Sequence, residues 1–596
     1  MKPHLRSSAR FARLSLERLE ERETPAGVVT VSLINNTISF LGDGNVSGNE
    51  VKVTATTNNH FLIEGQNGTT FILNKKNVGA TIDTAALPPG NPVFVFPNNG
   101  TTKLMAKFLA GPDRFEYDGF ANALLPRQFA DISLDMGMGN DTVLATQFVA
   151  KNMTILSTLP TGAITDNDNV TIAAGGQLDL IGAIPGPETY LGGIKGNLTI
   201  TGQTGSDATL LALTIGGNVT GTFVDAGDNF TIRGGSRIGG NVTLTETAGK
   251  LLGNNTINVM ESTQIGKNFT VNNLGNSLDA TLQNSRIGGN VVLNAGSGTT
   301  GSLFNLTNLD VGGNFDVKDG ALVDALSMNG ITIAKNLTLS MGDGGNGAGD
   351  TLQSLVVNGN LTVTYGKGAD FFSLQNSTIN GNATITNTDG VDRLQVLNTL
   401  VGRNFSYNGG NGGTQTGLNR DAINGVTVGG TLSMTYGTGN DELQLDNARI
   451  HGVATFRTGD GANLVQINTS QFFGALNITG GIAVDTVNCS NTMVFGVTNV
   501  NTAAGADVIN ITQSGRYKGK VTLNTGASID TINVEADLGQ ETTFLGGVSV
   551  TTGTEVDVTT AGFNGAGFVI IMNTLTYPDA ANLSDTVNLG NNLLIL

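Results

Sequence analysis

The sequence is poor in several residues on which many folds and sites depend. Tryptophan is absent, proline occurs 12 times and cysteine only once in 596 residues. The single cysteine, Cys489, excludes an intrachain disulfide framework and a thiolate metal cluster. Charged residues make up only 13% of the chain, which argues against Lys- and Glu-rich helical surfaces and against highly charged disorder. No apolar run approaches the roughly 18 residues of a membrane-spanning helix, so we expect no transmembrane segment.

The charges that remain are mainly acidic. The formal net charge is −17, whereas nucleic-acid binding needs clustered Lys and Arg side chains to contact phosphates. We therefore expect no nucleic acid among the partners. Glycine is abundant, with 84 residues, and the chain is long enough for several ordinary domains or for one long repeat array.

A repeat runs through the middle of the chain, with clear copies in IGGNVTGT at 215–222, IGGNVTLT at 238–245 and IGGNVVLN at 287–294. An aliphatic residue lies three positions before each Asn, and apolar residues lie mostly one and three positions after it. This is the period-two alternation of a half-buried strand. The Asn recurs mostly every 22 to 24 residues, at Asn197, Asn218, Asn241, Asn268, Asn290, Asn314, Asn336, Asn360, Asn382 and Asn404.

The period continues where the Asn disappears, because Val428, Ile450 and Phe472 occupy the slot of the aliphatic residue. A second strand precedes this slot, as in DTLQSL at 350–355 and DTINV at 530–534. Such short strands cannot bury an apolar face alone, but stacked turns can. The sequence therefore predicts an all-β fold, a single long parallel β-helix with turns of roughly 22 residues. At about 4.8 Å per turn, some 15 to 24 turns would make a rod of roughly 70–115 Å.

The repeated Asn has two interpretations. Asn-Val-Thr at 241–243 is an acceptor motif for N-glycosylation. The repeat favours another role, in which each Asn lies in a turn and its side-chain amide hydrogen-bonds its copies on neighbouring turns, while the following Thr points outward from a strand. We therefore predict an Asn ladder.

The chain divides by composition. Residues 1–26 are rich in Arg and lack the Gly-rich β pattern, residues 27–135 predict an irregular β region or cap, residues 136–548 form the repeat body, and residues 549–596 predict atypical last turns. The segment LERLEERETPAG at 16–27 resembles the N-terminal segment of large planctomycete proteins thought to be exported or displayed at the cell surface. The resemblance implies an export or sorting role for this leader and an extracellular or cell-surface location for the protein.

Candidate catalytic residues are few. His4, His60 and His451 have no partner His at ligand spacing, and no serine-hydrolase, zinc-protease or phosphate-loop motif occurs. Cys489 occupies an inward strand position, which predicts a buried apolar role. A pair such as Asp225 and Asp228 lacks the surrounding pattern of a lyase or hydrolase site. We therefore predict no catalytic residue, although β-helices also include carbohydrate-cleaving enzymes.

The aspartates that open the second strand are the one place where ligand chemistry is expected. GMGND at 137–141 and GTGND at 437–441 resemble half of a Gly-rich calcium-binding repeat. Stacked turns would bring like charges within roughly 5–8 Å, which is unfavourable. The side chains then turn into water, accept turn N–H bonds, or share a cation such as calcium. The nearest candidates for calcium are Asp441, Asp485, Asp507 and Asp530.

These features together predict an exported structural or adhesive β-solenoid of the cell surface or extracellular matrix, with no cofactor other than the calcium considered above. Its expected partners are surface glycans or other surface proteins. The alternative is a β-helix that binds or cleaves a polysaccharide. Convergence of acidic and basic side chains in one groove would favour the enzyme, and a Thr- and Asn-lined surface would favour the structural role.

Overall fold

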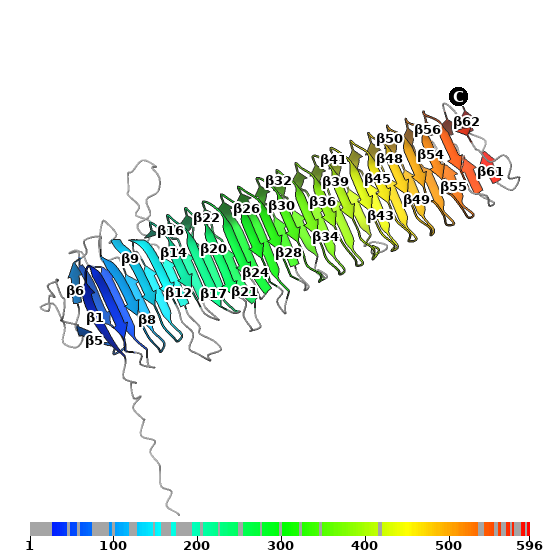
Figure 1. Ribbon diagram of the computed structural model, residues 1–596. Helices are drawn as coiled ribbons and strands as arrows, with labels where there is room; N and C mark the ends of the chain where they lie inside the picture. Colours follow the sequence, from blue (N-terminus) through cyan, green and yellow to red (C-terminus); the bar gives the residue numbers. More distant parts are fainter. Residues whose placement is uncertain are drawn as a thin grey trace, which may run out of the picture.

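A computed structural model shows a rod of stacked β turns and confirms the predicted all-β parallel solenoid (Figure 1). Its turns are roughly 23 residues long. The structure describes residues 27–595 apart from 44–47, 56–59, 74–93, 98–101, 119–127, 147–148, 157–168, 174–192, 203–206, 225–226, 248–253, 274–276, 297–300, 321–324, 345–348, 415–419, 535–540, 553–557, 562–567, 572–574, 577–585 and 590–592. The leader predicted at residues 1–26 lies outside the described residues.

Each regular turn contains three strands. In one such turn, β31 (Asp350–Gln353) is followed by β32 (Val356–Val357) and β33 (Leu361–Thr364). Each strand pairs in parallel with its counterpart one turn on, namely β34 (Phe371–Gln375), β35 (Thr378–Ile379) and β36 (Ala383–Thr386). Stacking therefore gives three parallel sheets. We call them wall 1 (the longer strands), wall 2 (the two-residue strands) and wall 3 (the four-residue strands).

The C-terminal half of the body repeats this pattern with little variation. Wall 1 contains β43 (Glu442–Asp446), β46 (Leu464–Asn468), β49 (Thr486–Ser490), β52 (Val508–Thr512) and β55 (Thr531–Val534). Wall 2 contains β44 (Arg449–Ile450), β47 (Gln471–Phe472), β50 (Met493–Val494) and β53 (Arg516–Tyr517). Wall 3 contains β45 (Ala454–Arg457), β48 (Leu476–Thr479), β51 (Thr498–Asn501) and β54 (Val521–Asn524).

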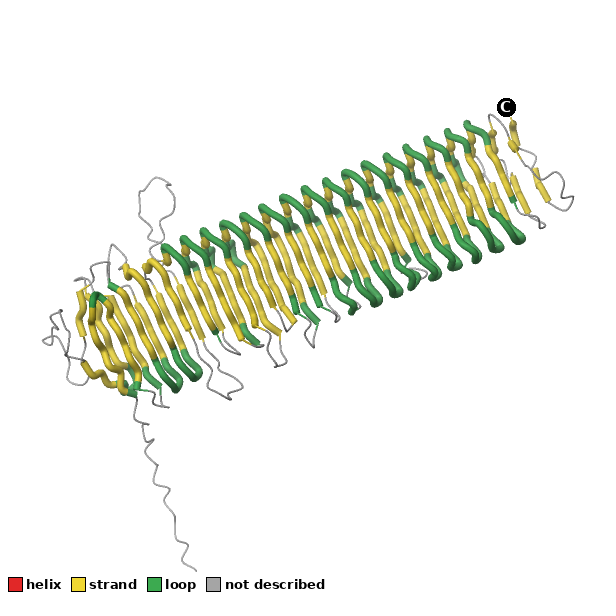
Figure 2. The backbone as a smooth tube through the Cα atoms, viewed as in Figure 1, coloured by secondary structure: helices red, strands yellow, loops and turns green. Residues whose placement is uncertain are grey.

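Three corners connect the walls. A bend joins wall 1 to wall 2, the predicted Asn turn joins wall 2 to wall 3, and an Asp-containing turn, here the Asp turn, joins wall 3 to wall 1 of the next turn. Figure 2 shows the loops gathered along two long edges of the rod, with strands between them. Residues that are one period apart in the sequence therefore become neighbours along an edge.

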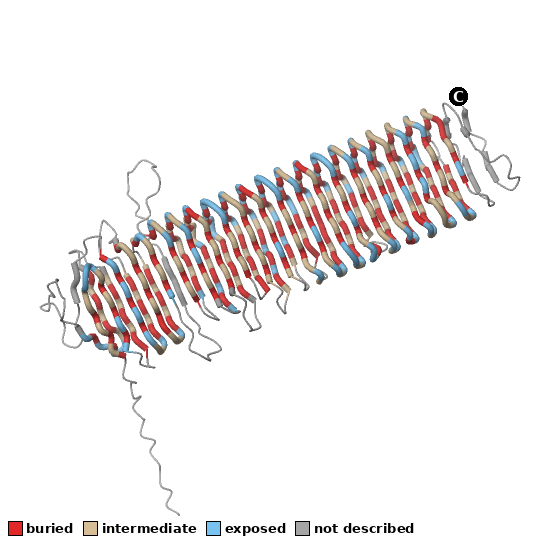
Figure 3. Tube along the Cα trace, in the orientation of Figure 1, coloured by how far each residue is buried: buried red, intermediate tan, exposed pale blue. Residues whose placement is uncertain are grey.

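The core is one continuous column of inward side chains. Strand positions alternate between buried and partly exposed along the whole body (Figure 3). Ile238, Ile287 and Ile333 are each at most 2% exposed, which confirms their predicted inward direction. Cys489 is also buried, in register with Ile467 and Ile511. The apolar residues thus stack on themselves from turn to turn, as a repeat array requires.

The N-terminal end departs from the repeat. β1 (Val28–Ile34) pairs antiparallel with β2 (Thr37–Gly42), and β3 (Glu50–Ala55) pairs antiparallel with β4 (His60–Gly65). β2 and β3 also pair in parallel with β7 (Lys103–Lys107) and β8 (Arg114–Asp118). These hairpins therefore continue walls 3 and 1 and occupy strand edges that would otherwise be open to pairing.

At the other end the parallel pairing continues to the last described strands. β55 pairs with β58 (Val558–Ala561), and β58 pairs with β61 (Thr586–Leu589). Wall 2 likewise continues to β62 (Leu593–Ile595). No helix in the described part of the chain is long and apolar enough to cross a membrane.

Candidate functional site: the edges of the solenoid

The predicted aspartates form a stacked column at the Asp turn. Asp485, Asp507 and Asp530 each lie one residue before a wall 1 strand, on three successive turns, and all three are buried. The backbone N–H of Asp485 donates to Oδ1 of Asp507 at 2.8 Å, and that of Asp507 donates to Oδ1 of Asp530 at 2.9 Å. The structure thus places these three candidate residues together.

Asp441 belongs to the same column but is separated from Asp485 by one turn. Asn463 occupies that turn, where its Oδ1 accepts the N–H of Asp441 at 3.0 Å and its Nδ2 donates to Oδ1 of Asp485 at 2.8 Å. We call these five residues the Asp column: Asp441, Asn463, Asp485, Asp507 and Asp530. Its Oδ1 atoms replace strand hydrogen bonds at the corner where the backbone turns, which is an ordinary role for Asp and Asn in turns.

Of the three arrangements expected from the sequence, the structure shows the one in which carboxylates accept turn N–H groups. The described residues contain no group of three or more His, Cys, Asp or Glu side chains arranged to hold a metal. Calcium at the four aspartates stays a prediction. Within the described residues, Oδ2 of Asp441 and Oδ2 of Asp507 are buried without a hydrogen-bond partner, and a buried charged oxygen of this kind is costly.

Burial shifts the carboxyls in and beside the Asp column toward the protonated form. It raises the pKa of Asp441 to about 8, with further contributions from the negative charges of Asp421 and Asp392. Burial also raises the pKa of Asp421 to about 7 and that of Asp485 to about 6. A protonated carboxyl keeps one oxygen as an acceptor and gains an O–H donor, so protonation removes the buried charge while leaving the stacking bonds in place.

Two buried tyrosines bond buried aspartates that lie on wall 1 strands rather than in the Asp column, and the sequence did not predict their role. The phenol of Tyr365 donates to Oδ2 of Asp350 at 2.7 Å, and that of Tyr436 donates to Oδ2 of Asp421 at 3.0 Å. Each Tyr lies 15 residues after its Asp. It is the residue directly after a wall 3 strand, and its side chain is buried. This constant offset was the available signal, but the direction of the Tyr side chain depends on the shape of the corner.

The Asn ladder is confirmed at the Asn turn, with a different donor from the one predicted. The backbone N–H of each Asn donates to Oδ1 of the Asn one turn earlier, at 2.8 to 3.2 Å. The ladder begins one step before the predicted repeat, at Asn152, and ends where Thr431 donates to Asn404. Amide-to-amide bonds occur at only some steps, as between Asn336 and Asn314 at 3.4 Å.

The bend between walls 1 and 2 holds a further Asn column that the sequence analysis missed. Its residues have φ between 47° and 52°, the left-handed region that Asn tolerates better than other side chains. Side-chain bonds connect some of them, as from Asn308 to Asn284 at 3.0 Å. The members are Asn284, Asn308, Asn376, Asn398, Asn447 and Asn491.

Near the Asn turn of the last regular turns, aromatic rings stack along the rod. The rings of His451 and Phe473 lie 4.8 Å apart and nearly parallel, and those of Phe473 and Phe495 lie 5.1 Å apart. Nζ of Lys518 lies 3.9 Å from the centre of the Phe495 ring, and the guanidinium of Arg449 lies 5.9 Å from that of Phe473. The predicted exposure of His451 is confirmed, and cation–π contacts hold two cations at this surface.

Two other places on the described part of the chain contain carboxylates beside a hollow or cavity. An open hollow at the bend contains Arg286 and Asp310, but these two side chains pair with each other at 3.3 Å. A small internal cavity of about 20 Å³, room for about one water molecule, is lined by Asp228 and Glu246 together with aromatic and amide side chains. Asp225 lies outside the described residues. Neither place combines a pair of carboxylates with open access to a substrate chain.

Comparison with protein-family models, with curated proteins and with solved structures finds no match to this chain.

Proposed function

We propose that the protein is an exported structural or adhesive rod of the cell surface or extracellular matrix. The observation that carries the proposal is the unbroken parallel stacking from β8 to β61, which makes one elongated body out of nearly the whole described chain. A rod of this kind presents long repetitive surfaces, which suit spacing, scaffolding and multivalent attachment.

The surface chemistry supports the same role. Outward positions of walls 1 and 3 are mainly Thr, Ser, Asn and Gln, and several of them bond to their own copies, as Asn510 does to Asn488 at 2.7 Å and Asn499 to Asn477 at 2.9 Å. Side chains that satisfy one another along the rod stabilise the stack. The leader that resembles planctomycete export segments supports delivery to the outside of the cell.

Fractionation of native cells tests this proposal, with immunodetection of the protein in cytoplasmic, envelope and secreted fractions. We expect the protein in the envelope or secreted fraction. A variant that lacks residues 1–26 should remain inside the cell, while a variant with the leader retained and Gln264→Asp changed on the exposed surface should be exported normally. Recovery of the native protein in the cytoplasmic fraction alone would contradict the proposal.

A further inference from the structure

Charge is segregated between the edges of the C-terminal half of the rod. Nine successive turns each contain a segment from the bend, through wall 2 and the Asn turn, to wall 3: 329–340, 353–364, 375–386, 397–408, 424–435, 447–458, 469–479, 491–501 and 513–524. These nine segments contain no Asp or Glu and seven Lys or Arg residues. Thirteen acidic residues of the stretch 341–534 all lie in the remaining parts of the turns, namely the Asp turn and wall 1.

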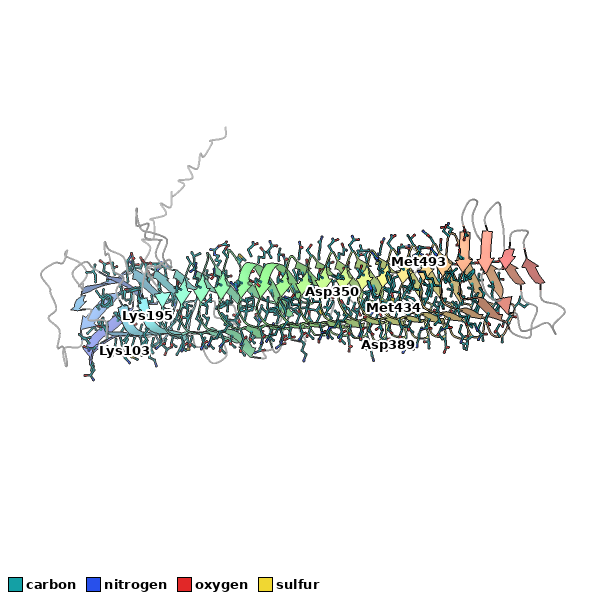
Figure 4. The ribbon with its side chains drawn as sticks, turned by 90° about the horizontal axis from the view of Figure 1, so that it is seen from above. Lys103, Lys195, Asp350, Asp389, Met434 and Met493 are labelled. Carbon is teal, nitrogen blue, oxygen red and sulfur yellow. The ribbon has the colours of Figure 1, made fainter. Side chains whose placement is uncertain are left out.

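This distribution of charge is not expected from the composition of the whole chain. The net charge is −17, so a random distribution would place acids on every side. In Figure 4, Met493, which lies on wall 2, and Asp389, which lies at the Asp turn, are toward opposite sides of the rod. Between residues 329 and 524, the charged residues on this side of an acidic molecule are therefore all Lys or Arg.

The cations are concentrated at one place on that side, which we call the cationic edge. It consists of Arg449, Arg516, Lys518 and Lys520, with the stacked rings of His451, Phe473 and Phe495 alongside. The four Lys and Arg side chains and His451 are exposed, and the two Phe rings are half-buried. Because each stacked ring covers the face of the next, the ring stack positions the flanking cations rather than offering open ring faces.

No acid lies beside the arginines of this edge in the register of wall 2. Arg449 is flanked by Thr427 and Gln471. Arg516 is flanked by Met493 and Thr543, and the one nearby acid on that strand, Glu541, accepts the Thr543 hydroxyl at 2.7 Å. Earlier in the same column, by contrast, Arg286 lies beside Asp310 and pairs with it at 3.3 Å. The column therefore pairs its arginine with an acid near the middle of the rod, whereas Arg449 and Arg516 nearer the C-terminal end have no acid directly in register.

We infer that the cationic edge binds a linear acidic polysaccharide, running along the rod. This inference rests on the proposed role at the cell surface for its biological setting. The rows beside the edge fit a sugar chain: Thr455, Asn477 and Asn499 offer hydroxyls and amides, and Val453 and Val497 are exposed apolar side chains for the C–H faces of sugar rings. Successive turns repeat every ~4.8 Å, close to the repeat of a linear pyranose chain.

A polysaccharide fits better than a nucleic acid. Nucleic acids carry densely spaced phosphates and demand many clustered cations, whereas this edge offers four Lys and Arg side chains over four turns on a chain of net charge −17. A polysaccharide with one carboxylate or sulfate per one or two sugars matches that sparser spacing, and the repulsion from the acidic Asp turns acts at a distance that physiological salt screens.

The test measures binding of the full-length protein to polygalacturonate, with dextran as a neutral chain and single-stranded DNA as the alternative polyanion. We expect binding to polygalacturonate that weakens steeply between about 50 and 200 mM NaCl, as ionic contacts to a linear polyanion do, and no binding to dextran. The variant R516Q/K518Q/K520Q should weaken the affinity by about tenfold or more. The matched control K103Q/K107Q/K151Q changes the net charge equally at the N-terminal end, where Lys103 and Lys107 pair with Asp131 and Asp135, and should change it by less than about twofold.

Three results would overturn the inference: absence of polygalacturonate binding at low salt, an equal loss of affinity in both variants, or tighter binding of single-stranded DNA than of polygalacturonate. Melting temperatures of both variants, expected within a few degrees of the parent because the substitutions are on the surface, establish that they are folded. The outcome is distinguishable from that of the fractionation, since a cytoplasmic protein that binds polygalacturonate contradicts only the surface role, and an envelope protein that does not bind it contradicts only this inference.

Discussion

At the scale of single residues, Asp441 connects the stability of the rod to pH. Its folded pKa of about 8 lies above the ordinary value of 3.8, so the folded chain holds this proton more tightly than the unfolded chain does. The free energy of unfolding therefore falls as pH rises from about 4 to 8 and levels off above that. Asp421 and Asp485, with pKa values of about 7 and about 6, act in the same direction.

We predict that Asp441→Asn raises the melting temperature at pH 8.5 and changes it little at pH 5, because the amide supplies an N–H where the carboxylate would be a buried charge. The gain at pH 8.5 should be about 1–3 kcal/mol. Asn463 shows that the column accepts an amide at this position, and the reverse change Asn463→Asp should steepen the pH dependence. Thermal melts followed by circular dichroism measure both, and an unchanged pH profile in Asp441→Asn would count against proton uptake by the column.

Calcium is an independent prediction for the same column. If the cation binds there, calorimetric titration at pH 8 gives heat, and a chelator lowers the melting temperature. Absence of both effects, with the pH dependence unchanged, would show that these carboxyls bind protons but not calcium. The residues concerned are Asp441, Asp485, Asp507 and Asp530.

Ile287 tests the core at a single residue. It is fully buried and lies in register between Ile265 and Val311. Ile287→Asp would place an unpaired charge among apolar side chains, and we expect a loss of several kcal/mol in the free energy of unfolding. Gln264→Asp, on the exposed face one turn earlier, should change stability by no more than about 0.5 kcal/mol. Chemical denaturation compares the two, and equal losses would contradict the inward direction of Ile287.

At the scale of elements, the Asn ladder predicts that substitutions of Asn336 lower the free energy of unfolding according to whether one acceptor atom is kept. Oδ1 of Asn336 accepts the backbone N–H of Asn360 at 2.9 Å. Asn336→Ala removes this acceptor and should cost about 0.5–1.5 kcal/mol, the net value of one hydrogen bond, because the site is exposed. Asn336→Asp retains Oδ1 and should cost less in the same denaturation assay. A larger loss in the Asp variant than in the Ala variant would exclude this role for Oδ1.

Much of each turn could be predicted from the sequence, because alternation along a strand fixes the inward direction of residues such as Ile238 and Ile333. The period also predicted the position of the Asn turn and of the Asp column. The bend was missed because a single left-handed residue, such as Asn376 or Asn398, leaves no period in hydrophobicity. The antiparallel pairing of β1 with β2 was missed because residues 27–135 contain no repeat from which register follows.

At the scale of the whole molecule, the site candidates depend on stacking rather than on local motifs. Arg449 and Arg516 are distant in sequence, and only the register of wall 2 places them on one edge with Phe473 and Phe495 between them. The shifted pKa of Asp441 likewise depends on burial at a corner, which the GTGND motif does not reveal. Composition alone predicted an acidic molecule, whereas the fold keeps Asp and Glu off one side of the rod between residues 329 and 524.

Residues one period apart stack in register along the rod, and an engineered disulfide can measure this register. In a Cys489→Ala background, Asn477→Cys and Asn499→Cys place two cysteines at paired positions of β48 and β51, about 4.8 Å apart at Cα and within disulfide reach. Asn477→Cys with Asn501→Cys is the control, because that diagonal pair is about 8 Å apart. We predict that mild oxidation yields the cross-linked peptide by mass spectrometry for the first pair and little for the second. Cross-linking of both pairs to the same extent, or of the diagonal pair alone, would contradict the register of β48 with β51.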